Sequence, residues 1–180
     1  MMKFELQNSF TNVAYDAIIN SLADSPTFRE LCGVESENKA KERIHIDTFA
    51  IAPIFGDSYT KIEVEKIIPC AVVCTSGYGS SFGREESGVG KYHAKGKLAV
   101  SIYIPVPAEY VVKAEVTPEG IKIIESIAGK ILMEMEQLTR TTGKQYLIFE
   151  SCRLTGTAVN PPEQQASAGT IAVVDMEFNY

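Results

Sequence analysis

Hydrophobic positions near the start of the chain follow a helical pattern, and serine, proline and glycine mark where helices begin and end. The apolar stripe has spacings of three and four and consists of Phe10, Val13, Ala14, Ala17, Ile18 and Leu22. It predicts a helix over residues 9–23. Ser25, Pro26 and Gly33 then predict a second helix of two turns, because they suit the N-cap, the first helical position and the end of a helix. The charged segment 35–43 is expected to be a polar connector.

Later segments carry strand patterns, interrupted by one further helix. The predicted strands are residues 44–51, 61–65, 67–75, 98–106, 145–159 and 169–180, and a short helix is the alternative for residues 61–65. In residues 98–106, large apolar side chains alternate with smaller or polar ones, which is typical of a strand with one face in the core. Thr117, Pro118 and Glu119 predict the start of a long helix, since they fit the cap, the first position and the first turn. Its apolar stripe continues to Leu138.

This order of elements predicts an α+β fold of two layers. The sheet is expected to be largely antiparallel and covered on one face by the two main helices, in the order α-α-β-β-β-loop-β-α-β-β. The chain has 180 residues, which suits a single domain over residues 1–180 that is large enough to bury its own core. No internal repeat is present, which excludes solenoids and propellers.

Residues 76–97 form the most unusual segment, because glycine, serine and charged residues replace the hydrophobic pattern there. We predict a long flexible loop or arm without secondary structure, and loops of this length are usually functional or disordered. Its aromatic residues have two interpretations: they fold back onto the body, or they anchor a partner, as aromatic and arginine side chains often do. The candidate partner-binding residues are Tyr78, Phe82, Arg84, Glu85, Glu86, Tyr92 and His93.

Charge and composition argue against several classes of function. The formal net charge is −6, which argues against a surface that grips nucleic acid, since such a surface needs clustered lysine and arginine. No apolar stretch approaches the length of a membrane span, and the start of the chain lacks a secretory signal. The four cysteines are therefore expected to be reduced thiols in a cytosolic protein, two of them filling the core.

No motif predicts catalysis, a cofactor or a metal. In residues 77–83, Phe82 stands at the position where a dinucleotide fingerprint needs its third glycine. Gly90-Lys91 resembles the end of a P-loop, but the other residues of that motif are missing. His45 and His93 have no local nucleophile or orienting partner, and the cysteine spacing does not suit zinc. We expect His45 to lie on a strand, at the surface or partly buried. The sequence predicts a protein that is not an enzyme.

The overall order of elements resembles the tail-terminator, or tail-completion, family of tailed bacteriophages. The segments that carry this likeness are residues 10–22, 67–73, 98–106, 120–138 and 171–180. The resemblance implies an α+β subunit that forms a ring, commonly a hexamer, which caps the tail tube and joins it to the neck or head. Its implied partners are copies of itself and the tail-tube and neck proteins. Its implied locations are the cytoplasm of a bacterial host during assembly and then the virion tail.

Two alternatives remain open at this point. Within the same class, the chain would be another neck, head-completion or baseplate component. In a different class, it would be a small α+β enzyme or ligand-binding domain, with residues 76–97 acting as a lid over a pocket between the sheet and the helices.

Overall fold

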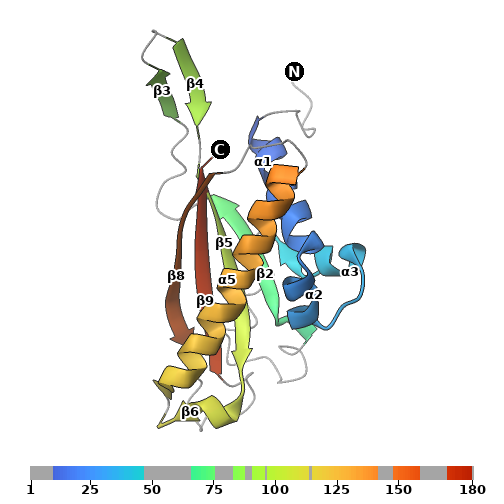
Figure 1. Ribbon diagram of the computed structural model, residues 1–180, viewed down its shortest axis with the longest axis vertical. Coiled ribbons are helices and arrows are strands. Elements are labelled where there is room, and N and C mark those ends of the chain that lie inside the picture. The colour runs from blue at the N-terminus through green and yellow to red at the C-terminus, as the bar shows by residue number, and fades with distance from the viewer. Residues whose placement is uncertain are drawn as a thin grey trace, which may run out of the picture.

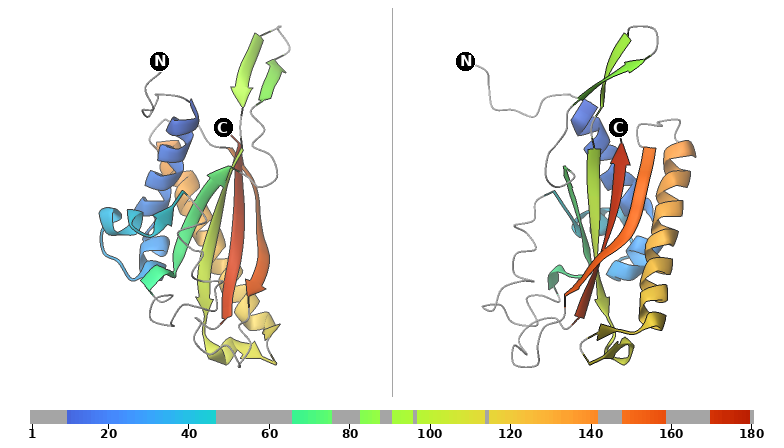
Figure 2. Two further views of the ribbon diagram at one scale, coloured as in Figure 1. Left: turned by 180° about the vertical axis from the view of Figure 1, so that it is seen from behind. Right: turned by 90° about the vertical axis from the view of Figure 1, so that its left-hand side faces the viewer.

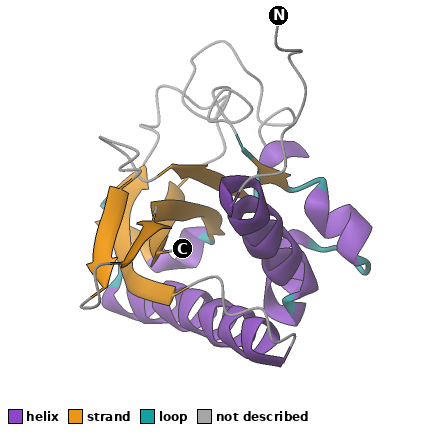
Figure 3. Ribbon diagram, turned by 90° about the horizontal axis from the view of Figure 1, so that it is seen from above, coloured by secondary structure: helices purple, strands orange, loops and turns teal. Residues whose placement is uncertain are grey.

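Helices and a five-stranded sheet form two layers in the computed structural model of the chain (Figure 1). The structure describes residues 10–46, 66–75, 83–87, 91–95, 97–113, 115–141, 148–158 and 170–179. The main helices lie on one side of the sheet (Figures 1 and 3). The α+β prediction is therefore confirmed.

The predicted helices are present among the described residues, and α3 is an addition. The helices are α1 (Phe10–Asp24), α2 (Pro26–Cys32), α3 (Glu37–Lys41) and α5 (Pro118–Thr141), and a 3₁₀ turn, η2, covers Ala108–Tyr110. The segment 35–43, predicted as a polar connector, contains α3, which the predicted order of elements did not include. Ser36 caps α3 by accepting a hydrogen bond from the Lys39 backbone N–H.

Side-chain caps fix the ends of α2 and the start of α5. Ser25 Oγ accepts a hydrogen bond from the Phe28 backbone N–H at 3.0 Å. Gly33 follows α2 in the left-handed region at φ 64°, which glycine adopts without a steric penalty. Thr117 Oγ1 accepts from the Gly120 N–H at 3.2 Å, so the predicted caps at both helices are confirmed.

The main sheet has the strand order β1-β2-β5-β9-β8. Its strands are β1 (Ile44–His45), β2 (Cys70–Thr75), β5 (Lys97–Val106), β9 (Thr170–Asn179) and β8 (Ile148–Ala158). All neighbours are antiparallel except β1 and β2, which are parallel. The central position of β5 places the most clearly alternating segment of the sequence in the middle of the sheet.

Two further pairs of short strands stand outside this sheet. The strands β3 (Gly83–Ser87) and β4 (Lys91–Lys95) form one antiparallel pair, and β6 (Val111–Val112) and β7 (Glu115–Val116) form the other. The prediction that residues 76–97 lack secondary structure was therefore wrong. The three residues between β3 and β4 include two glycines, which are typical of a short hairpin connection, and this outweighs the weak strand propensity of the charged residues.

The core lies between the helices and one face of the sheet. The fully buried members of this core include Ile18, Leu22, Phe28, Leu98, Val100, Ile102, Ile131 and Met176. On β5 and β9, every second residue enters this core, as the alternation predicted. On α1 the buried stripe is narrower than expected, because Val13 remains 36% exposed while Ala14 is buried.

The opposite face of the sheet changes character along its length. At the end nearest Pro69 it carries a second buried apolar cluster, which consists of Ile68, Cys70, Val72, Tyr103 and Ile171. Farther along, Ser101 Oγ donates a hydrogen bond of 2.5 Å to Asp175 Oδ1 on the neighbouring strand. The sheet thus has an apolar end and a polar end on this face.

Some predictions fall outside the residues that the structure describes. The expected strand over residues 61–65 lies there, as do most of the predicted strand 44–51 and the turn-rich segment 160–168. The predicted strand 67–75 begins later than expected, since β2 starts at Cys70. Residue 67 is helical, and Pro69 has no N–H to donate to a neighbouring strand.

Two glycines of α5 provide a matched pair for a stability measurement. A Cβ at Gly120 would lie 2.8 Å from both Tyr110 Cβ and Val116 Cγ1, whereas a Cβ at Gly129 would have no neighbour within 4 Å. We expect Gly120→Ala to destabilise the protein by about 1–3 kcal/mol through overpacking. Gly129→Ala should stabilise it by about 0.5–1 kcal/mol, since alanine favours helix more than glycine. Urea unfolding of both variants checks the opposite signs, and equal shifts would contradict the packing at Gly120.

Candidate partner-binding surface

The pair β3–β4 forms an arm that projects beyond the end of the main sheet (Figures 1 and 2). In the figures it extends past the end of the sheet at which the C-terminus lies, on the side opposite β6. One residue separates β4 from β5, so the arm is attached directly to the central strand. We call β3 and β4 together the arm.

Five of the seven predicted partner-binding residues lie in the arm, and its register sorts them into two groups. Glu85 is opposite His93 on one face, and Glu86 is opposite Tyr92 on the other face. Arg84 is opposite Ala94 and shares the face of Glu86. The other two predicted residues, Tyr78 and Phe82, lie outside the described residues.

Glu134 on α5 joins the start of α2, a contact that sequence patterns did not predict. Its Oε2 accepts hydrogen bonds from Ser25 Oγ at 2.5 Å and from the Thr27 backbone N–H at 3.1 Å. Its Oε1 accepts from Thr27 Oγ1 at 2.7 Å. The carboxylate therefore ties two helices together at a point where Ser25 is fully buried. The hydrogen-bond donors come from residues more than 100 positions away in the sequence, a separation at which local patterns give no signal.

The charge state of Glu134 follows from these contacts. Burial alone would raise the pKa of the carboxyl group, but the hydrogen bonds from Ser25 and Thr27 favour the ionised form. Together with the nearby Lys130 ammonium, they hold the pKa below its ordinary value of 4.5. The group is thus an ionised structural link, and nothing in its pKa suits a general acid near neutral pH.

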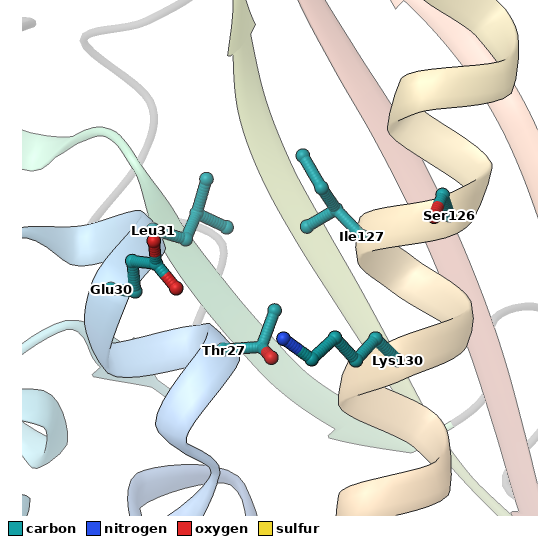
Figure 4. A pocket seen from close by; sticks show the side chains of 6 residues that line it. All are labelled: Thr27, Glu30, Leu31, Ser126, Ile127 and Lys130. Atoms are coloured by element: carbon teal, nitrogen blue, oxygen red, sulfur yellow. The ribbon is translucent and has the colours of Figure 1, made fainter.

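A cavity of about 260 Å³ lies beside this link, between α2 and α5 (Figure 4). Its lining residues are Thr27, Glu30, Leu31, Ser126, Ile127 and Lys130. Leu31 and Ile127 provide its apolar wall, and the Lys130 side chain extends toward Thr27 (Figure 4). These residues include no histidine or cysteine and no paired carboxylates, so they do not form a nucleophile with its base.

A second cavity, of about 870 Å³, lies where η2 meets the start of α5. Glu109, Tyr110, Thr117, Pro118, Glu119 and Lys122 line it. The start of α5 lies at the end of the molecule that carries β6, away from the arm (Figure 1). Neither of these two cavities is lined by a residue of β3 or β4.

Two cysteine thiols and one imidazole of the described residues are at least partly buried. Cys32 and Cys70 are free and buried, and burial raises the pKa of each thiol to about 12. Such thiols are poor nucleophiles near neutral pH. Burial and then the Arg43 charge lower the pKa of His45, which is half-buried on β1 as predicted.

Within the described ranges, no group of three or more histidine, cysteine, aspartate or glutamate side chains is arranged to hold a metal ion. Among the same residues, no helix is both long enough and apolar enough to span a bilayer. The candidate partner-binding surface is the arm, because it projects beyond the main sheet and contains five of the seven predicted residues. A comparison with protein-family models and with curated proteins finds no match for this chain.

Proposed function

We propose that this chain is a structural subunit of a phage or prophage tail, a tail terminator that forms a ring and caps the tail tube. The observation that carries the proposal is the arm, a two-stranded hairpin that leaves the body of the molecule at the central strand (Figure 1). An isolated two-stranded hairpin is at best marginally stable in water. A partner that pairs with it or packs against it would supply the missing stabilisation.

The rest of the molecule fits a rigid support for such an arm. The two-layer body buries its own core. A ring requires heterologous contacts, in which one patch of a subunit meets a different patch on the next copy. An arm at one end of an asymmetric body provides one half of such a contact. The proposal places the subunit in the host cytoplasm during assembly and then at the end of the tail tube.

Removal of the arm tests this function. We expect deletion of residues 77–95 to leave a folded body that stays a single protomer, whereas the full chain forms a ring. Native mass spectrometry and sedimentation velocity measure the mass, and cosedimentation with tail tubes of the encoding phage measures capping. The unfolding transition of the truncated chain, compared with that of the full chain, controls for loss of the body.

Two results would contradict the proposal. The first is a full chain that stays a lone protomer at high concentration and does not bind tail tubes. The second is a truncated chain that still forms rings and binds tubes as the full chain does, because the arm would then not be the docking element. Binding to the portal side of the head in place of tube ends would favour the neck alternative.

A further inference from the structure

We infer that the arm of one copy adds its strand β3 to the free edge of β8 on the next copy, extending the main sheet from subunit to subunit. This inference rests on the proposed function, since it names the surface that the arm would meet in the ring. It concerns two strand edges of the same chain that lack a described neighbour.

The first of these edges belongs to β8. This strand has 11 residues and stands at the end of the strand order, paired only with β9 among the described strands. One side of its backbone therefore presents N–H and C=O groups without a described partner strand, which is the usual template for adding a strand. At about 3.3 Å per residue, its edge is about 36 Å long, about twice the length that a five-residue strand needs.

The second edge belongs to β3, which pairs only with β4 among the described strands. The arm cannot turn onto β8 of its own chain, because β4 runs into β5 after one residue and β9 lies between β5 and β8. The arm also projects away from the sheet (Figure 2). The two edges can therefore meet only between copies, and a contact between two different edges is heterologous, as a ring requires.

The charged residues at the paired positions favour β3 over β4 as the added strand, and they favour Arg153 as the position opposite Glu85. Arg153 of β8 is opposite Asp175 of β9, and Glu85 of β3 is opposite His93 of β4. If β3 joins β8 antiparallel with Glu85 opposite Arg153, residue types across the extended sheet run Asp175, Arg153, Glu85, His93. Opposite charges on adjacent strands stabilise a sheet, and like charges weaken it. Adding β4 in place of β3 would instead bring a face that carries Lys91, His93 and Lys95 to the face of Arg153, without a carboxylate among them.

A charge-exchange experiment with the full chain tests this contact. We expect Glu85→Lys and Arg153→Glu each to weaken association roughly tenfold per contact, since each replaces an attraction by a repulsion. An equimolar mixture of the two single variants should form rings again, because each arm then meets an edge of opposite charge on the other variant. Matched controls of the same charge change, Glu109→Lys and Lys122→Glu, lie at the β6 end and should assemble like the unaltered chain. Sedimentation velocity measures all of these samples.

A second measurement does not depend on the charges. Hydrogen exchange of the β8 amides should be slowed in the assembled ring and return to the faster rate when residues 77–95 are deleted. The inferred contact is wrong, and the proposed function stands, if the full chain forms rings but neither measurement responds. In that case both single variants assemble normally, and the hydrogen-exchange rate of the β8 amides is the same with and without residues 77–95. If the full chain forms no ring at all, the contact and the proposed function fail together.

Discussion

Replacement of Phe28 by alanine is expected to lower the free energy of unfolding by about 3–5 kcal/mol. Phe28 has 0% exposure and is the largest of the fully buried side chains in the core. It lies on α2 and belongs to the core cluster between the helices and the sheet, where its truncation would leave a cavity. Urea unfolding followed by circular dichroism measures the effect as a lower midpoint with an unchanged slope.

Met133→Ala provides the matched control for this substitution. Met133 is 71% exposed on α5, and its truncation should change stability by no more than about 0.5 kcal/mol. Phe28→Leu should fall between the two, since it retains most of the buried volume. A loss at Phe28 as small as that at Met133 would mean that α2 does not pack into the core as the structure has it.

Replacement of Glu134 by alanine is expected to lower the free energy of unfolding by about 2–4 kcal/mol. Hydrogen bonds to an ionised group contribute about 1.5–3 kcal/mol each and are not additive, and their loss leaves the buried hydroxyl groups of Ser25 and Thr27 without this acceptor. Glu125→Ala, an exposed position on the same helix, controls for the removal of one carboxylate and should be nearly neutral. Equal effects of the two substitutions would contradict the link.

The contribution of Glu134 should also depend on pH. Its pKa is lower in the folded protein than the ordinary value of 4.5, so its stabilisation is fully present above about pH 4.5 and is lost as the pH falls through the folded pKa. The stability difference between the unaltered protein and Glu134→Gln should therefore be largest near pH 7 and shrink toward pH 3. Urea unfolding at both pH values measures it, and a constant difference would mean that the carboxylate is not the stabilising form.

Local signals in the sequence were sufficient for most of the fold. Ser25, Pro26 and Gly33 act on neighbouring backbone groups only, so the limits of α2 could be predicted from adjacent residues. The alternation of β5 likewise identified the residues that face the core. Secondary structure with a strong short-range cause was thus predictable, and so was the α+β class that follows from its order.

The predictions failed where the local sequence signal is weak or where the interacting residues are far apart in the chain. The arm has little strand propensity, and its only local signal is a three-residue connection with two glycines, which we interpreted as part of a flexible loop. The link at Glu134 joins residues 107 and 109 positions apart, and no local pattern reports such a pairing. The candidate surface could be located in the sequence, but the opposition of Glu85 to His93 required the register of the hairpin.

The attachment of the arm to β5 has a mechanical consequence. A pull on the arm along its length is delivered to a ten-residue strand that is held on both sides by antiparallel neighbours. Hydrogen bonds in antiparallel pairs run across the strands, so such a load shears many of them together and does not open them one after another. Tension on this subunit would therefore be carried by the strongest part of its sheet, while a hairpin rooted at an outer strand would peel away.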